Sequence, residues 1–126
     1  DVLAAARENA LGVVGYSPLA QGLLSNRYLE AVPEGSRAAR TWTAEQREQI
    51  TPALREKIWM LDELAKRRGQ SLPQMAIAWV LRNPDMTSAL IGASEIEQIE
   101  ENANALENLP FSDEELRRID EVSPTA

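Results

Sequence analysis

Apolar residues recur through the second half of the chain with the spacing of amphipathic helices. Between Thr51 and Gly69 they return every three or four positions, at Leu54, Ile58, Leu61 and Ala65. A proline in the first turn, a basic last turn and the closing glycine mark the two ends of this segment. The pattern predicts one helix with a buried face.

Further helices are expected from the same kind of evidence. The segment from Ser71 to Asn83 is apolar on nearly every side, which is typical of a deeply buried helix. Ser94-Glu-Ile-Glu97 and Ser112-Asp-Glu-Glu115 each fit a capping box. Behind the first box an apolar stripe is predicted, at Ile96, Ile99, Ala103 and Leu106. Residues 1–9 predict the end of an alanine-rich helix that has no capping signal and begins upstream.

Two short apolar runs predict buried strands, from Leu11 to Tyr16 and from Thr87 to Ile91. The helices between them imply parallel pairing through a right-handed crossover. Residues 20–49 read as a long irregular loop with a turn near Gly35. Two parallel strands cannot close a barrel and leave both edges open, so we expect an α/β fold whose remaining strands are missing.

Composition restricts the function classes. The chain has 126 residues, of which 44% are hydrophobic and 26% charged, as in one ordinary soluble domain. It has neither a membrane-length apolar run nor the features of a signal peptide. The absence of cysteine and histidine excludes disulfides, thiolate metal sites and the commonest proton shuttle, and we expect a cytoplasmic protein. The net charge of −7 argues against nucleic-acid and anionic-membrane partners.

No self-contained catalytic set is visible, and no metal site is predicted. Glu97, Glu100 and Glu101 have the spacing of a solvated helix face rather than of a metal or acid–base cluster. Lys57 and Lys66 are expected on a helix surface. The three tryptophans are expected to pack, although Trp42, which lies in the long loop, is also placed to line a pocket. The residues therefore point to binding rather than catalysis.

Binding is predicted where the two strands end, and the two exits are expected to share one site. Gly92 and Ser94 lead from the second strand into a helix N-terminus, where free N–H groups attract anions. The alternative is that Ser94 only caps the helix and Gly92 only turns the chain. At the first exit Tyr16 offers a ring face and Ser17 a hydroxyl, unless the ring simply packs at the strand end.

An arginine group follows the first exit and is compatible with a small phosphorylated ligand. Its members are Arg27, Arg37, Arg40 and Arg47. Arg27 and Arg37 could close over a pyrophosphate, although loop arginines are also commonly solvated.

Two motifs resemble segments of the aldo-keto reductases. Gly15-Tyr-Ser-Pro-Leu-Ala-Gln-Gly-Leu-Leu-Ser-Asn-Arg-Tyr28 resembles the segment that follows their seventh strand. Leu90-Ile-Gly-Ala-Ser-Glu-Ile-Glu-Gln-Ile-Glu-Glu-Asn102 resembles their phosphate-binding segment after the eighth strand, about 70 residues further on. The resemblance covers essentially the whole chain. It is strongest to the branch of potassium-channel β-subunits and glyceraldehyde-3-phosphate reductases.

This resemblance implies the C-terminal portion of a (β/α)8 TIM barrel, whose site lies at the C-terminal ends of its strands. Residues 1–126 would form a single partial domain, with a cofactor-covering loop over 17–50 and a terminal helix over 112–122. The family's proton-donating tyrosine and its aspartate, lysine and histidine partners lie in the first half of the barrel. This chain does not match that half, so the resemblance implies that the chain alone is catalytically incompetent.

The resemblance also implies a cofactor, NADP(H) rather than NAD(H), with Tyr16 stacked on the nicotinamide ring. Five residues would line the pyrophosphate path: Ser17, Pro18, Leu19, Gln21 and Gly22. The loop arginines Arg27 and Arg37 would add phosphate contacts. The adenosine end would be held by residues after the second strand, with Gly92, Ser94 and Gln98 at the 2′-phosphate and Glu101 and Asn102 at the adenine.

Three functions stay open. The first is the cofactor-binding part of an NADPH-dependent oxidoreductase that reduces a small carbonyl substrate, an aldehyde or ketone, by hydride transfer. The second is a non-enzymatic truncated module that binds nucleotide weakly or self-associates through exposed barrel edges. The third is a structural or regulatory relative of the barrel, as the channel-subunit resemblance allows.

Overall fold

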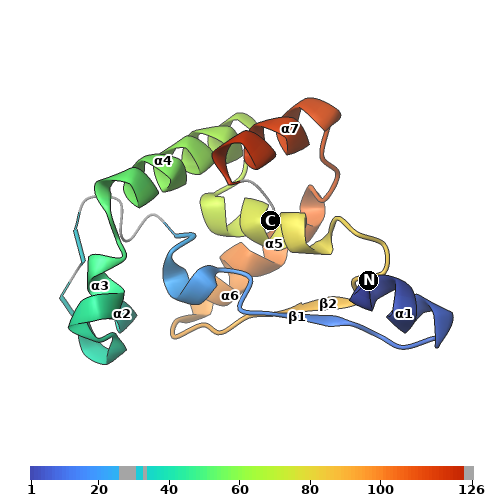
Figure 1. The fold of residues 1–126 in the computed structure, drawn as a ribbon, viewed down its shortest axis with the longest axis horizontal. Helices are drawn as coiled ribbons and strands as arrows, with labels where there is room; N and C mark the ends of the chain where they lie inside the picture. The colour runs from blue at the N-terminus through green and yellow to red at the C-terminus, as the bar shows by residue number, and fades with distance from the viewer. Residues whose placement is uncertain (26–30, 33, 124–126) are drawn as a thin grey trace.

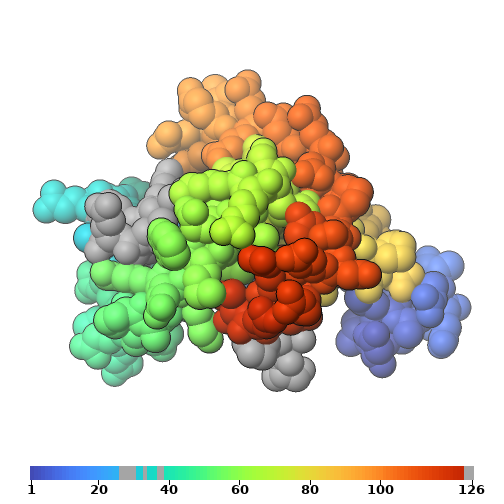
Figure 2. All heavy atoms as spheres, turned by 90° about the horizontal axis from the view of Figure 1, so that it is seen from above, coloured from blue at the N-terminus to red at the C-terminus, as the bar shows by residue number. Residues whose placement is uncertain are grey.

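The computed structural model describes residues 1–25, 31, 32 and 34–123, with the backbone alone at 37 and 38. Two short strands, β1 (Val14–Tyr16) and β2 (Ser88–Leu90), lie beside a group of helices (Figure 1). The helix α1 (Val2–Glu8) and the segment carrying α2 (Arg37–Thr41) and α3 (Ala44–Glu48) lie at opposite ends of the molecule (Figure 2). The remaining helices pack between these two ends.

β1 and β2 pair in parallel, which confirms the predicted α/β class and pairing. The register joins Val14 to Ser88, Gly15 to Ala89 and Tyr16 to Leu90. Each strand has three residues and is shorter than the apolar run that predicted it. One face of the pair is open, since Val14, Tyr16 and Leu90 are all more exposed than buried.

The other face of the sheet lies against α5 (Leu72–Leu81). A Cβ built on Gly15 would stand 2.8 Å from Cγ1 of Val80 and 3.5 Å from Sδ of Met86. Only a residue without a side chain fits β1 this closely against the helix. Gly15 therefore sets the spacing between the strand and α5.

The core lies where α5 meets α4 (Pro52–Arg67) and α7 (Asp113–Val122), seen as three neighbouring helices in Figure 1. Its buried residues are Ile58, Leu64, Ala65, Leu72, Met75 and Ile119. The predicted helix starts are confirmed for these three elements. The Thr51 side chain accepts a hydrogen bond from the N–H of Leu54, and capping boxes begin at Ser71 and Ser112. Trp79 packs against this core, as predicted.

The side chain of Arg68 joins the end of α4 to the start of α7, and we call its contacts the Arg68 clamp. The side chain is only 2% exposed. It donates to Oε2 of Glu115 at 2.7 Å and to the carbonyl oxygens of Asn108 and Pro110 at 3.2 and 3.0 Å. The guanidinium also lies 3.8 Å from the ring centre of Phe111. One buried cation thus satisfies several acceptors across the helix junction.

The segment predicted as irregular, 20–49, contains more structure than its pattern indicates. A 3₁₀ turn, η1 (Ala20–Gly22), is followed by α2 and α3. Ser36 and Thr43 cap the two short helices, with side chains that accept from the N–H groups of Ala39 and Gln46. Helices of five residues are too short to show periodicity, so only their caps could have predicted them.

The helix α6 (Ile96–Ala103) and the following η3 (Asn104–Glu107) carry the predicted apolar stripe but lack the predicted capping box. The stripe is exposed, with 71% exposure at Ile96 and 53% at Ile99, while Asn102 and Ala105 are buried. The predicted capping box is absent, because Glu95 occupies the cap position without a side-chain hydrogen bond. Periodicity identified the apolar face, but no described element covers it.

Two smaller expectations also fail. Asp1 caps α1 by accepting a hydrogen bond from the N–H of Leu3 at 3.1 Å, so this helix does have a capping signal. Trp59 does not pack, since 55% of it is exposed on the outer side of α4. Lys57 and Lys66 are exposed as predicted. Among the helices of the described ranges, none combines the length and the apolarity needed to cross a membrane.

Candidate functional site

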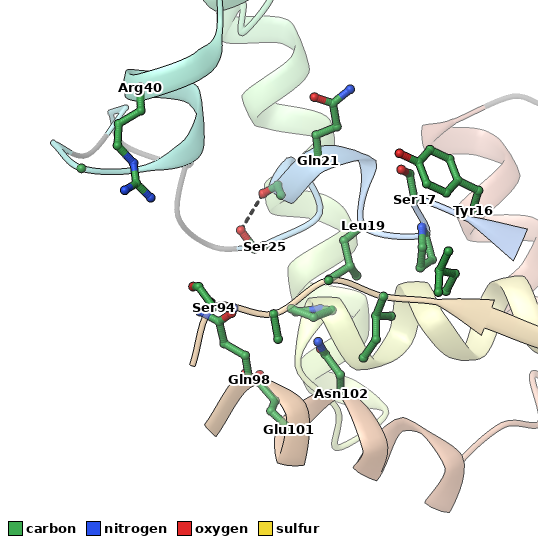
Figure 3. A pocket seen from close by; sticks show the side chains of 18 residues that line it. Tyr16, Ser17, Leu19, Gln21, Ser25, Arg40, Ser94, Gln98, Glu101 and Asn102 are labelled. Atoms are coloured by element: carbon green, nitrogen blue, oxygen red, sulfur yellow. Dashed lines mark hydrogen bonds between the residues drawn. The ribbon is translucent and has the colours of Figure 1, made fainter. Parts of the chain in front are cut away.

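The carboxyl ends of β1 and β2 open into one cavity of about 660 Å³ (Figure 3). Because the strands are parallel and Tyr16 pairs with Leu90, the residues that follow them leave the sheet at the same edge. The β1 exit forms one wall of the cavity, and the β2 exit with α6 forms the other. The two predicted exits therefore share one site.

The first wall is a tight turn with an unusual backbone. Ser17, Ala20 and Gln21 all have positive φ angles, of 53°, 46° and 57°, although none of them is glycine. The turn is closed by hydrogen bonds from the Ala20 N–H to the Ser17 carbonyl and from the Gly22 N–H to the Leu19 carbonyl. Strained backbone of this kind concentrates at binding and catalytic sites. The exposed ring of Tyr16 stands at the start of this wall.

The second wall runs from Leu90 into α6. The Ser94 N–H donates to Oε1 of Gln98 at 3.1 Å, and this contact replaces the predicted cap. A Cβ built on Gly92 meets no protein atom within 4 Å, so packing does not require glycine there. That Gly92 lets a ligand approach the backbone closely stays a prediction.

The base of the second wall is fixed to the core. The Gln74 amide donates to the carbonyl oxygen of Glu101 at 2.9 Å and so joins α5 to α6. Asn102 is buried as a residue, yet its amide lines the cavity and points toward the strand exit in Figure 3. The polar groups at the base of this wall, Glu101 and Asn102, are therefore held by a helix rather than by a loop.

The cavity brings together every predicted site residue except the two loop arginines. These residues are Tyr16, Ser17, Pro18, Leu19, Gln21, Gly22, Gly92, Ser94, Gln98, Glu101 and Asn102. Arg27 lies outside the described residues, and Arg37 begins α2 with its side chain undescribed. Their roles toward a cofactor stay predictions.

Several further lining residues were not among the site residues predicted from the sequence: Ser25, Gly35, Arg40, Pro73, Leu90, Ile91 and Ala93. Arg40 belongs to the arginine group after the first exit, and this was the one signal that could have found it. The hydroxyl of Ser25 donates to the Gly22 carbonyl at 2.6 Å. Pro73 comes from α5, far along the chain, and no local pattern points to it.

A second hollow of about 320 Å³ adjoins the first and shares Ser17 and Gln21 with it. Trp42 lines this hollow, as its alternative placement predicted. Within the described ranges no cluster of acidic side chains could hold a metal ion. Glu97, Glu100 and Glu101 are all exposed, which confirms the expected solvated face.

The family model for the aldo/keto reductases matches residues 1–124. The L-glyceraldehyde 3-phosphate reductase of Escherichia coli O157:H7 is 44% identical over 118 residues, which are 91% of this chain and 34% of that protein. The same-named protein of Escherichia coli strain K12 is 43% identical over 118 residues, with the same two shares.

A putative voltage-gated potassium channel subunit beta of Schizosaccharomyces pombe is 33% identical over 126 residues, which are 97% of this chain and 37% of that protein. The chain thus spans about a third of the length of these curated relatives. With a family match over nearly its whole length, the chain belongs to the aldo/keto reductase family.

Proposed function

We propose that the chain forms the last two β/α units of a (β/α)8 barrel and is the cofactor-binding part of an NADPH-dependent reductase of aldehydes or ketones. One observation carries the proposal: the exits of both parallel strands line a single cavity. Active sites of such barrels lie at this end of the strands. Family membership supports the same assignment.

The cavity fits NADP(H) in size and in the order of its groups. Its volume of about 660 Å³ is within the usual range for small-molecule sites. Tyr16 lies at one end and Ser94 and Gln98 at the other, with the Ser17–Gly22 turn between them (Figure 3). An extended dinucleotide would place its nicotinamide against the Tyr16 ring and its ribose phosphate beside Ser94 and Gln98.

When bound, NADPH supplies a hydride for the carbonyl carbon of the substrate. This chain's own residues bind and orient the cofactor. Tyr16 presents a ring face for stacking, and the turn that follows it presents backbone and hydroxyl groups to phosphate oxygens. We place the proton donor beyond this chain, because the resembled family carries it in the first half of the barrel. The name of the bacterial relatives makes a short phosphorylated aldehyde a candidate substrate.

The proposal is tested by calorimetric titration of the protein with NADP⁺. Replacing both Ser94 and Gln98 with alanine is expected to weaken binding about 10- to 100-fold, since two hydrogen bonds to a charged phosphate are lost. Glu100→Ala, an exposed change on α6 outside the cavity, is the matched control and should leave the affinity unchanged.

If the double variant binds NADP⁺ as tightly as the unmodified protein, the phosphate assignment is wrong. A carbonyl-dependent NADPH oxidation assay tests the second part of the proposal. We expect no turnover from these 126 residues alone. Clear turnover would show that the catalytic groups do not lie elsewhere.

The exposed apolar face of α6 and η3 favours a second candidate, a non-enzymatic module that self-associates. Ile96, Ile99 and Leu106 form this face, and the two-stranded sheet has open edges. We expect sedimentation velocity to show concentration-dependent association that decreases when Ile96 and Ile99 are both changed to lysine. A monomer at all concentrations would remove this candidate.

A further inference from the structure

One face of the two-stranded sheet is apolar and uncovered. Side chains at paired positions of β1 and β2 share a face, so Val14, Tyr16 and Leu90 point to the same side, and each is more than half exposed. The opposite face packs on α5 through Gly15. In a closed parallel barrel the face away from the helices is the interior, where valine and leucine side chains are common. The uncovered face of this sheet is therefore suited to a barrel interior.

Both edges of the sheet are free as well. The Ser88 N–H donates to the Val13 carbonyl at 3.2 Å, so these two backbone groups lie between the strands. The N–H and C=O groups of the next residue along a strand point to the opposite edge, which places those of Val14 and Ala89 on the outside. Within the described ranges no further strand pairs with either edge. Each copy thus offers one β1 edge and one β2 edge for parallel pairing.

No segment within these 126 residues is left to cover the sheet. The residues outside the described ranges are 26–30, 33 and 124–126, which are too few to supply the missing strands of a barrel. In a solution of these residues alone, the only strands that can reach the free edges belong to other copies. The occupant of each free edge is then a second copy of the chain.

The charges on α6 restrict which sides of two copies can meet. The exposed apolar residues Ile96 and Ile99 follow β2, and Glu97 and Glu100 are exposed on the same helix. Pairing this helix with its counterpart in another copy would bring the glutamates of both copies together, and the repulsion between like charges opposes such a contact. A symmetric contact of α6 with α6 is therefore disfavoured.

The β1 side of the molecule offers an apolar surface to the β2 side of a neighbour. Val2 of α1 and Leu11, which precedes β1, are both exposed. In Figure 1, α1 lies where β1 begins and α6 lies toward the end at which β2 finishes, so the two short helices of neighbouring copies can lie end to end beside the joined strands. Such a head-to-tail contact joins apolar surfaces and keeps the α6 helices apart.

We propose that four copies of this chain pair the β2 edge of each with the β1 edge of the next and close one eight-stranded parallel barrel. The inference rests on the part of the proposed function that makes each copy two β/α units. A barrel of this kind has eight strands, and four two-stranded sheets supply them. Its interior layers hold four side chains from alternate strands, so each layer would contain four copies of one residue, such as Val14 or Leu90. This match favours a closed ring over an open filament.

Sedimentation equilibrium of the 126-residue protein tests the ring. We expect a species of about 56 kDa, four times the 14.0 kDa of the chain, whose mass stops rising with concentration. Val14→Pro removes the outward N–H of β1 and should reduce the mass to that of a single chain. Val14→Ile keeps that N–H and an apolar side chain, so it is the matched control and should remain tetrameric.

A second variant, Ala89→Pro, blocks the other edge and tests the head-to-tail order. Each proline variant alone should be monomeric. A 1:1 mixture should form pairs of about 28 kDa, twice the mass of the chain, because one intact β2 edge and one intact β1 edge remain. Circular dichroism of both variants should match that of the unmodified protein. If either is unfolded, Val14→Lys, an exposed change in one copy that the ring would bury, replaces it and is expected to be monomeric.

The outcomes separate the ring from the function on which it rests. An unmodified protein that is monomeric, dimeric or grows without limit would overturn the ring, as would a tetramer that Val14→Pro leaves intact or a mixture that forms no pairs. NADP⁺ titration decides the proposed function separately, because the cavity is built from residues of one copy. A monomer that binds NADP⁺ contradicts only the ring, and a tetramer that binds none contradicts only the cofactor assignment.

Discussion

Replacing Arg68 with alanine will lower the free energy of unfolding by about 2–3 kcal/mol, because it removes a buried cation that donates hydrogen bonds to a carboxylate and to backbone carbonyls across a helix junction. The side chain is 2% exposed and is the donor that Glu115 and the carbonyls of Asn108 and Pro110 share. Without it the Asn108 carbonyl keeps only the hydrogen bond from the Gln70 amide, and Glu115 keeps only those from Ser112. Urea denaturation followed by circular dichroism measures the loss.

The control for the Arg68 clamp is another arginine–glutamate pair in which both groups are exposed. Arg117 pairs with Glu121 along α7, and Arg117→Ala should cost less than about 1 kcal/mol. Arg68→Lys keeps the charge but cannot reach every acceptor. Its loss in the free energy of unfolding should therefore lie between those of Arg68→Ala and Arg117→Ala. Equal losses at Arg68 and Arg117 would contradict the clamp.

The same clamp predicts a dependence on pH. Burial raises the pKa of Glu115, but hydrogen bonds from Ser112 and Arg68 lower it by more, so the pKa lies below its ordinary value. A carboxylate of this kind stabilises the fold fully above its ordinary pKa, and that stabilisation is lost as the pH falls through the lowered pKa. The difference in stability between the unmodified protein and Arg68→Ala should therefore shrink as the pH falls through that lowered value.

Ile58→Ala will cost about 2–5 kcal/mol, because it removes a fully enclosed side chain and leaves a cavity between three helices. Ile58 is 2% exposed and packs in the cluster that α4, α5 and α7 share. The next residue along α4 gives the control. Trp59 is larger but 55% exposed, and Trp59→Ala should change the stability by no more than about 0.5 kcal/mol.

Urea denaturation of both variants decides this comparison. A greater loss at Trp59 than at Ile58 would mean that the outer side of α4 is covered in solution. The core would then be assigned wrongly.

Local signals predicted the helices that build the core. The capping boxes at Ser71 and Ser112 involve residues three positions apart, and the periodicity over 51–69 lies within one element. The Arg68 clamp could not be predicted in this way, because its partner Glu115 is 47 positions away. The sequence indicated only a basic last turn before Gly69.

The failure at α6 has a different cause. A serine three residues before a glutamate fits a capping box, but Gln98, one position further, accepts from the Ser94 N–H instead. Likewise, the spacing of Ile96 and Ile99 identified an apolar face correctly and could not tell whether anything packs on it.

The site was more predictable than its surroundings because it follows from topology. Parallel strands end at one edge, so the residues that follow Tyr16 and Leu90 had to leave the sheet on the same side once the pairing was correct. Arg40 and Pro73 reach the same cavity from elements whose packing is not encoded nearby. Only the three-dimensional packing of α2 and α5 shows that these two residues line the cavity.

The close approach of Gly15 to Val80 has a consequence for any ligand that rests on Tyr16. Tyr16 is the residue next to Gly15, so the packing of Gly15 against Val80 sets the position of the aromatic ring relative to the sheet. A larger or smaller side chain at position 80, which lies behind the sheet, would move β1 and so change the orientation of the Tyr16 ring. Affinity could thus be tuned from behind the sheet without altering a single group that the ligand meets.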